Sequence, residues 1–266
     1  MSDSDDLLIL TPDQKQFFDE NGFLHLKDFY TEEEVKELRQ EFHTLVSNQD
    51  NRPKNMSYSC MEPAEGYETD PFNPRNVTGM MDHVLANDFW IDHFAEPQIV
   101  SVFVDLFGPN IDFHNGKIRN KPPGFVCTQS WHQDFPYEVH TEPDLAAAIT
   151  YIEETDFEAG ATEVVPGSHK NGLWEPIEKV TIREELVDEG TWEVVRAQPG
   201  DVVVIHVLVV HRAGHNFTNT SRHAIINEYK TKETIDQWNN RCALAGMPLA
   251  RNGKPLVTPI CFRTSI

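Results

Sequence analysis

The chain has 266 residues, of which 39% are hydrophobic and 10% are aromatic. This is enough apolar surface to build a folded core, so a disordered chain is excluded. The chain carries 22 Lys and Arg residues against 43 Asp and Glu residues, and its formal net charge is −21. A surface of this charge repels phosphate backbones and anionic lipids, so we expect no binding to nucleic acids or membranes.

Targeting signals and cysteine spacing bear on the cellular compartment. The longest near-apolar stretch, at 202–210, is far shorter than the roughly 20 residues of a transmembrane helix. The N-terminus begins Met1-Ser2-Asp3, with neither the basic nor the apolar region of a signal peptide. We therefore expect a cytoplasmic protein, either a monomer or a homodimer. No CxxC pair is present, which favours reduced thiols at Cys60, Cys127, Cys242 and Cys261.

The N-terminal part of the chain, at about 11–107, has mainly helical signals. Thr11-Pro12 predicts a helix that ends near Gly22, followed by a strand over 23–26. A capping box at 31–34 predicts a second helix, and 83–107 a further helical stretch. Residues 48–80 are polar and rich in proline, so we expect a long loop there, acting as a lid or a substrate-contacting segment.

The rest of the chain, at about 110–263, has the pattern of an antiparallel β-structure. Short apolar or alternating runs are separated by Gly and Pro turns, which is typical of a double-sheet jelly roll. We expect a mainly β fold with N-terminal and flanking helices, forming a single domain over 1–266. The predicted strands are 111–119, 125–131, 145–153, 161–165, 192–197, 202–206, 222–230 and 256–263.

Two histidine clusters suggest a metal site. His132 and Asp134 are two residues apart, so in an extended strand their side chains share a face and converge on one ion. This spacing occurs about once by chance in such a composition and is weak evidence alone. His206 and His211 are an odd number of residues apart, so at most one of them joins the pair unless the chain bends. Two histidines and one carboxylate leave coordination positions open for oxygen activation by Fe(II).

A candidate for anion binding follows eleven residues after His211. Arg222 begins the apolar run at 222–229, and an antiparallel neighbouring strand would return it to the side of the metal. Its guanidinium offers a bidentate fork for a carboxylate.

In the order and spacing of its motifs, the chain resembles the phytanoyl-CoA dioxygenase (PhyH-like) family of Fe(II)/2-oxoglutarate oxygenases. The resemblance implies a double-stranded β-helix, with O2 as the oxidant, iron ligands at His132, Asp134 and His211, and Arg222 on the distal carboxylate of 2-oxoglutarate. It also implies that the neighbouring histidines at 169, 206, 215 and 223 are not ligands. The matching residues are Trp131-His132-Gln133-Asp134, Ala159-Gly160-Ala161, Val165-Pro166-Gly167-Ser168-His169, Gly200-Asp201-Val202, His206, His211, Gly214, Asn216 and Arg222.

The chain departs from the family pattern at two positions. Ala213 stands where relatives often have Ser, and Ile149-Thr150 stands near where relatives have Trp. We expect the Thr150 hydroxyl to compensate as a 2-oxoglutarate contact. Asn115, Lys117 and Arg119 alternate on one face of a predicted strand. We expect Asn115 and Lys117 to contact 2-oxoglutarate and Arg119 to contact the substrate.

The residues around the histidine motif indicate the class of substrate. Aromatic side chains beside polar ones suit a small polar metabolite, and we expect it to be hydroxylated with release of succinate and CO2. With Asp134 as a ligand, no position is left for a halide, which favours hydroxylation over halogenation. Oxidative cyclisation, desaturation or acyl-CoA hydroxylation are alternatives, as are a cupin-like metal isomerase or hydrolase and a non-catalytic binding protein. The expected substrate contacts are Arg119, Gln129, Trp131, Phe135 and Tyr137.

Overall fold

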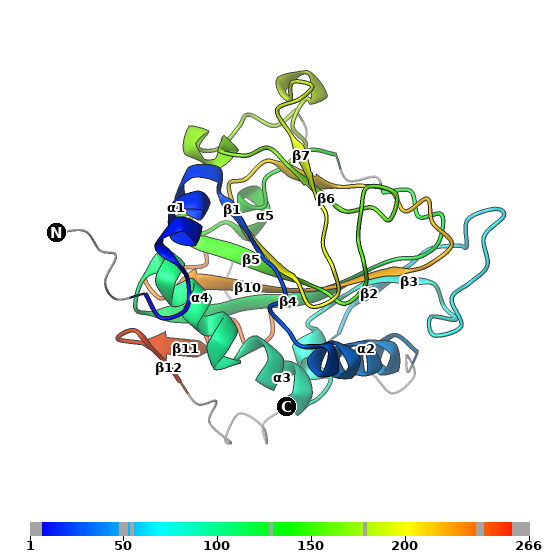
Figure 1. Ribbon diagram of the computed structural model, residues 1–266, viewed down its shortest axis with the longest axis horizontal. Coiled ribbons are helices and arrows are strands. Elements are labelled where there is room, and N and C mark those ends of the chain that lie inside the picture. The colour runs from blue at the N-terminus through cyan, green and yellow to red at the C-terminus, as the bar shows by residue number, and fades with distance from the viewer. Residues whose placement is uncertain are drawn as a thin grey trace.

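The computed structural model describes residues 7–47, 53, 56–127, 130–177, 180–237 and 242–256. Its centre consists of two antiparallel sheets, a large one of nine strands and a small one of three, with helices on the outer side of the large sheet (Figure 1). The predicted mainly β fold with N-terminal and flanking helices is confirmed. Among the described residues, every helix is too short or too polar to cross a bilayer.

The large sheet has the strand order β1-β8-β5-β10-β4-β11-β12, and β3 extends it by pairing with β4 and β2. Every pairing is antiparallel, and β10 lies between β5 and β4. Its strands are β1 (Phe23–Leu26), β2 (Tyr58–Cys60), β3 (Val77–Met81), β4 (Ile111–Lys121), β5 (Leu145–Tyr151), β8 (Val202–His206), β10 (Arg222–Thr231), β11 (Pro248–Arg251) and β12 (Lys254–Pro255).

The small sheet has the order β7-β6-β9. It packs against the large sheet through a cluster that includes Tyr151, Val164, Val195 and Val203. The cavity described below lies between these two layers, because side chains of both sheets line it. The strands of the small sheet are β6 (Thr162–Val164), β7 (Glu193–Val195) and β9 (His211–Ala213).

The first two helices confirm the local sequence signals. The side chain of Thr11 accepts a hydrogen bond from the backbone N–H of Gln14, and Gly22 ends the helix in the left-handed conformation at φ 76°. The second helix buries one apolar face, including Phe42, on the large sheet. These helices are α1 (Pro12–Asn21) and α2 (Glu32–Ser47).

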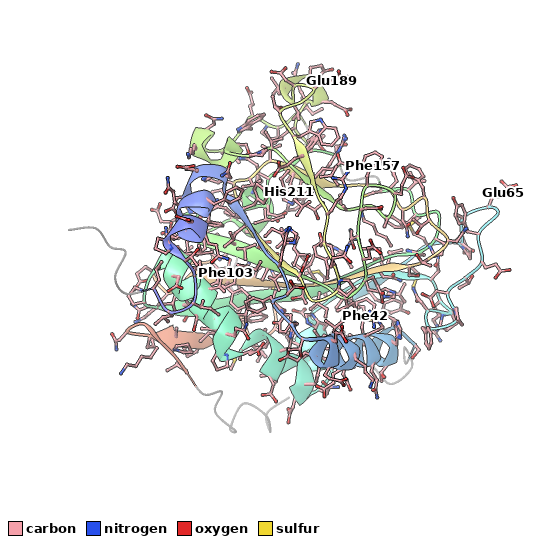
Figure 2. All side chains as sticks on the ribbon, viewed as in Figure 1. Phe42, Glu65, Phe103, Phe157, Glu189 and His211 are labelled. Carbon is pink, nitrogen blue, oxygen red and sulfur yellow. The ribbon has the colours of Figure 1, made fainter. Side chains whose placement is uncertain are left out.

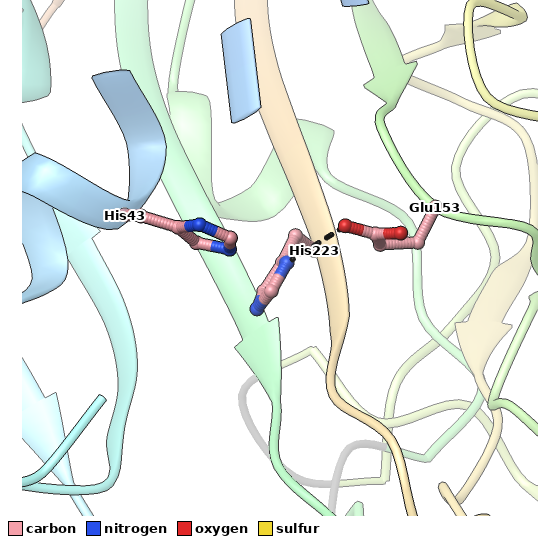
Figure 3. Close-up of side chains that lie close together, drawn as sticks. All are labelled: His43, Glu153 and His223. Atoms are coloured by element: carbon pink, nitrogen blue, oxygen red, sulfur yellow. Dashed lines mark ion pairs between the residues drawn. The ribbon is translucent and has the colours of Figure 1, made fainter. Parts of the chain in front are cut away.

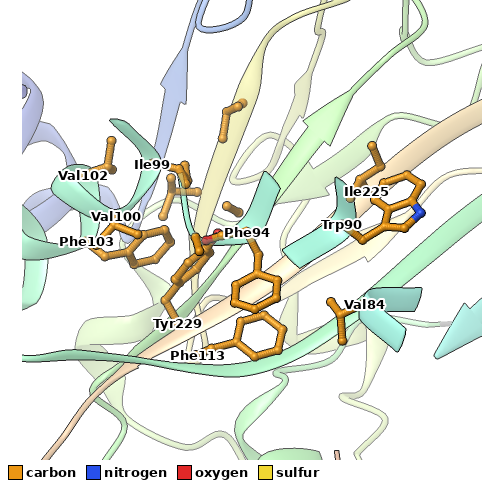
Figure 4. Packing of buried hydrophobic residues seen from close by; sticks show 14 of the residues in the cluster. Val84, Trp90, Phe94, Ile99, Val100, Val102, Phe103, Phe113, Ile225 and Tyr229 are labelled. Carbon is orange, nitrogen blue, oxygen red and sulfur yellow. The ribbon is translucent and has the colours of Figure 1, made fainter. Parts of the chain in front are cut away.

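The predicted helical stretch over 83–107 is interrupted. Pro97 occupies the first turn of its last helix, where the ring and the missing N–H are tolerated, so a new helix begins there. The pieces are the 3-10 helix η2 (His83–Leu85), α3 (Asp88–Phe94) and α4 (Pro97–Phe107). Figure 4 shows their aromatic side chains against the large sheet, with ring centroids 3.9 Å apart for Phe94 and Phe113 and 4.1 Å apart for Phe103 and Tyr229.

Two further expectations need correction, and a third falls almost entirely outside the described residues. The predicted loop at 48–80 contains β2 and part of β3, because β3 pairs with β4 and β2 pairs with β3. The predicted strand at 125–131 is irregular where it is described, and residues 257–263 of the last predicted strand lie outside the described residues. Short helices connect the strands at α5 (Phe135–Glu138), η3 (Ser168–Asn171) and η4 (Glu184–Leu186), and β9 and β11 were not predicted.

Buried histidines make the fold sensitive to acid. Burial lowers the pKa of His93 to about 4, and its Nε2 atom has no hydrogen-bond partner among the described residues. The unfolded chain, with an ordinary histidine pKa near 6.5, binds a proton at pH 5 that the folded state does not. Stability is therefore lost as the pH falls from about 6.5 towards 4.

We predict that His93→Phe reduces this acid sensitivity. The free energy of unfolding should fall between pH 7.5 and pH 5 by roughly 2 kcal/mol less in the variant than in the original chain, because one proton-linked group is removed. Urea unfolding at both pH values measures the difference. Equal losses in the two proteins would contradict the assignment of His93 as a buried neutral group.

Candidate active site

A cavity of about 290 Å³ lies between the two sheets. Arg222, Lys117 and Arg119 reach it from the large sheet, and His211 reaches it from the small sheet, where Figure 2 shows it near the middle of the molecule. The full lining is Ser59, Thr78, Lys117, Arg119, Asn120, Lys121, Phe125, Cys127, His132, Asp134, Ala147, Ile149, Thr162, Ile205, His211, Ala213, Arg222 and Ile226. The lining thus contains four cationic side chains and one carboxylate in a chain of net charge −21.

His132, Asp134 and His211 converge at one end of this cavity. The Nε2 atom of His132 lies 3.5 Å from Oδ1 of Asp134, and the Nε2 atom of His211 lies 3.7 Å from Oδ2. One donor atom from each residue lies within 4.8 Å of the others. His132 and His211 are also joined by two backbone hydrogen bonds of 3.0 and 2.9 Å, which fix the two rings side by side.

The reason for the convergence differs from the predicted one. His132 forms an isolated bridge with His211, and Asp134 has helical dihedral angles at the start of α5, so the motif does not lie in an extended strand. A turn brings the carboxylate back beside the imidazole. His211 reaches the site because residues 207–210 bend the chain from β8 in the large sheet into β9 in the small one.

The hydrogen bonds of the two histidines fit a metal centre. Nδ1 of His132 is 2.9 Å from the carbonyl oxygen of Ser130, and Nδ1 of His211 is 3.0 Å from that of Val209. A proton on each Nδ1 leaves the Nε2 lone pairs directed at the side of Asp134, as in protein metal sites. Burial and the neighbouring His132 lower the pKa of His211 to about 4, so its ring is neutral and able to bind a metal.

The charge of Asp134 is also stabilised. Burial alone would raise the pKa of this carboxyl, but His211, His132 and Lys117 outweigh burial and hold it well below its usual range. Two imidazoles and an ionised carboxylate are the donor set that suits a divalent iron ion with open positions.

The other histidines of the motif region lie elsewhere. The His206 ring packs against Phe18 and Phe107, with centroids 6.2 and 6.0 Å away. His169 lies beside His206, and His215 accepts a hydrogen bond from the backbone N–H of Cys127.

Arg222 is the first residue of β10 and lines the cavity from the large sheet. Its Nη2 donates a 2.8 Å hydrogen bond to the carbonyl oxygen of Gly160, and its buried Nε has no partner among the described residues. The pKa of Arg222 is lowered by burial, yet such a group stays charged. A buried guanidinium with an unused donor fits a carboxylate ligand that supplies the missing acceptor.

Lys121 is a site residue that the sequence analysis did not identify. Its ammonium donates hydrogen bonds to the carbonyl oxygens of Gly160, at 2.9 Å, and of Gly214. Burial and the nearby Arg222 lower its pKa well below the usual value. The signal was available, because Lys121 continues the alternation of 115, 117 and 119 along β4.

Gly160 permits this arrangement. Its φ is 76°, and a Cβ atom there would lie 2.7 Å from the carbonyl oxygen of His215 and 2.8 Å from that of Gly214. Only glycine therefore lets the loop of Gly160 approach the loop of Gly214 closely enough for their carbonyl groups to accept the hydrogen bonds of Lys121 and Arg222.

Lys117 is held by a carboxylate that the sequence analysis also missed. Its Nζ lies 2.5 Å from Oε1 of Glu228, and Asn115 donates to Oε2 at 2.7 Å. Burial alone would lower the pKa of Lys117, but Glu228 outweighs burial and raises it. Burial and the nearby Glu138 raise the pKa of Glu228 to about 7. Glu228 escaped notice because it contacts Lys117 only through the pairing of β10 with β4.

A second cavity of about 330 Å³ adjoins the first, and Lys117, Arg119 and Asp134 line both. Asn115 and Tyr137, both expected ligand contacts, line this second cavity. The shared residues make the two cavities neighbouring parts of one site.

The structure places three expected contact residues away from both cavities. Thr150 is adjacent to the cavity residue Ile149 on β5, so its side chain points to the other face of the sheet. The Trp131 ring packs against the guanidinium of Arg212, 4.4 Å from its centroid, and Phe135 packs against a small buried cluster. Gln129 lies outside the described residues.

Comparison with known proteins identifies the lineage of the chain. The model of the phytanoyl-CoA dioxygenase (PhyH) family matches residues 18–224. A probable alpha-ketoglutarate-dependent hypophosphite dioxygenase of Stutzerimonas stutzeri is 25% identical over 241 residues, covering 85% of this chain and 79% of the relative. The peroxisomal phytanoyl-CoA dioxygenase of Rattus norvegicus is 28% identical over 239 residues, covering 85% and 70%.

Solved structures support the same fold. EctD from S. alaskensis, in its apo form, matches with a TM-score of 0.74 at 17% identity, covering 93% of this chain and 89% of EctD. The non-heme alpha-ketoglutarate-dependent carbocyclase SnoK from nogalamycin biosynthesis matches with a TM-score of 0.67 at 19% identity, covering 94% and 97%. The jelly-roll architecture expected from the sequence is thereby confirmed.

The ion pair of Lys117 and Glu228 gives a stability prediction. Glu228→Gln leaves a buried ammonium without its counter-charge, and we expect the free energy of unfolding to fall by about 3–5 kcal/mol. The double variant Lys117→Met/Glu228→Gln removes both charges and should recover most of this loss. Urea unfolding of the three proteins measures both effects, and a double variant as unstable as Glu228→Gln would contradict the assignment.

Proposed function

Because the chain belongs to the phytanoyl-CoA dioxygenase family of Fe(II)- and 2-oxoglutarate-dependent oxygenases, we propose that it hydroxylates a C–H bond of a small polar metabolite. Membership of this family favours a dioxygenase over the three alternatives, which are a metal isomerase, a hydrolase and a non-catalytic binding protein. We also infer a single domain over 1–266, because the proposed site draws residues from both sheets and from the loops between them.

His132, Asp134 and His211 are the proposed iron ligands. The observation that carries this assignment is the pair of backbone contacts at Nδ1, which direct Nε2 of both rings towards the Asp134 carboxylate. When bound, Fe(II) and 2-oxoglutarate activate O2, so that the substrate is oxidised while 2-oxoglutarate becomes succinate and CO2. Since Asp134 takes one position on the metal, hydroxylation is favoured over halogenation.

Arg222 is the proposed partner of the distal carboxylate of 2-oxoglutarate. Its fixed guanidinium, with Nε unused, presents a fork at the cationic side of the cavity. Lys121 adds positive charge beside it and is held in place by two carbonyl groups. Ala213 offers no hydroxyl there, but its strand neighbour Thr162 also lines the cavity and supplies one.

Arg119 supports the proposal that the substrate carries a negative charge. It lines both cavities, together with Asp134, and its side chain makes no hydrogen bond or ion pair with any described residue. Lys117 and Lys121 are engaged by protein groups, and Arg222 is assigned to 2-oxoglutarate, so Arg119 remains for a second anion. The relative from Stutzerimonas stutzeri is named for hypophosphite, which is itself a small anion.

The first test measures turnover of 2-oxoglutarate. Protein purified without oxygen, loaded with Fe(II) and then exposed to air, should release succinate from 2-oxoglutarate. Asp134→Ala should lower this rate by at least ~100-fold, because the metal loses a ligand. The exposed Asp188→Ala serves as the matched control and should keep full activity. Absence of 2-oxoglutarate binding and turnover, or equal rates for Asp134→Ala, would sink the proposal.

The second test addresses the charge of the substrate. We expect small carboxylates or phosphonates to stimulate succinate release more strongly than their neutral amides or esters, in a library of such pairs. Arg119→Gln should weaken the apparent affinity for a stimulating anion about tenfold, the equivalent of ~1.4 kcal/mol. Arg119→Lys should recover part of it, and the KM for 2-oxoglutarate should change little. Equal stimulation by acids and amides would contradict the role of Arg119.

A further inference from the structure

A second cluster of metal-binding side chains lies behind the large sheet, away from the cavity. His43 comes from α2, Glu153 follows β5, and His223 is the second residue of β10 (Figure 3). One donor atom from each of the three lies within 4.8 Å of the others. His223 follows Arg222 on the strand, and its side chain points to the opposite face, where its ring lies 4.6 Å from that of Phe42.

The buried imidazole of His223 needs a partner. Its side chain is 4% exposed, and neither ring nitrogen forms a hydrogen bond with a described residue. Two carboxylates lie close by, with Oε1 of Glu153 at 3.4 Å from Nδ1 and Oδ2 of Asp70 at 3.9 Å from Nε2. A buried polar ring without a hydrogen bond is costly, so this arrangement calls for a group between the ring and the carboxylates.

The net charge of the side chains around the cluster favours a bound cation. Asp70 and Glu153 supply two negative charges, and Arg39 supplies one positive charge through a 2.9 Å hydrogen bond from Nε to Oε1 of Glu153. Without the two histidines, these three side chains sum to −1.

We propose that His43, Glu153 and His223 form a second, non-catalytic site for a divalent transition metal of the zinc type. Two imidazoles and a carboxylate are suitable ligands for Zn²⁺, whose tetrahedral sites place donor atoms ~3.4 Å apart. The Nδ1 atom of His223 and Oε1 of Glu153 already have this separation. Glu153 is 29% exposed, so water reaches the site and can take the fourth position.

The neighbouring residues have the arrangement of outer partners at a metal site. Asp70 faces the other ring nitrogen of His223, as the carboxylates behind metal-bound histidines do. Arg39 holds the Glu153 carboxylate. The Phe72 ring stacks on His43 at 4.3 Å between centroids. A metal here would tie α2 and the segment that contains Asp70 and Phe72 to the back of the strand that carries Arg222.

The number of bound ions tests this site. Equilibrium dialysis of the full chain against Zn²⁺ at pH 7.5 should give two ions per chain, and one ion for Asp134→Ala, in which the active-site ligands are incomplete. Adding His43→Ala, or the isosteric Glu153→Gln, to Asp134→Ala should remove the remaining ion. Circular dichroism confirms that each variant is folded.

A matched control addresses the other histidine–carboxylate cluster, formed by His114, Glu138 and Glu228. Asp134→Ala/His114→Ala should keep one ion. The proposal is overturned if Asp134→Ala binds no ion, or if its ion survives both His43→Ala and Glu153→Gln. Should the active site itself fail to hold Zn²⁺, the original chain would bind one ion that His43→Ala removes, so the two proposals fail separately.

Discussion

The concentration of four cations around one carboxylate is the constraint on which the site depends. In a chain of net charge −21, three of these four cations are held by neighbouring groups of the protein. Lys117 has Glu228, whereas Lys121 and Arg222 have backbone carbonyl groups. Carbonyl groups satisfy hydrogen bonds without cancelling charge, and the cavity therefore stays positive where a dianionic co-substrate is proposed to bind.

Local signals predicted the parts of the fold that depend on neighbouring residues. The cap at Thr11 and the turn at Gly22 define α1 by themselves, and the alternation along β4 and the apolar run of β5 both indicate strands. The irregular path at 125–127 was not readable, because an apolar run becomes a strand only if another strand pairs with it. The opposite holds for β3. Its segment has the composition of a loop, but it forms a strand because it pairs with β4.

In the candidate site, too, local signals predicted some residues, and others depend on contacts between distant strands. Spacing brought His132 and Asp134 to attention, but the bend at 207–210 that selects His211 over His206 depends on the switch between sheets. Periodicity alone left that choice open, and the family resemblance made it. Glu228 lies 111 residues from Lys117, and Lys121 meets Gly214 across 93 residues. Such contacts follow from strand register, which the sequence of one strand does not specify.

Strand β10 links the two faces of the large sheet. Arg222 points into the cavity and His223 points towards α2, so consecutive residues serve the co-substrate side and the outer cluster. The register is fixed on both flanks, by Ala224 opposite Tyr151 on β5 and opposite Arg119 on β4. A slip of one residue would send Arg222 to the outer face of the sheet and His223 into the cavity. The pairing of β10 with both neighbours is therefore what keeps the guanidinium inside, and any contact that anchors His223 from behind stabilises the same register.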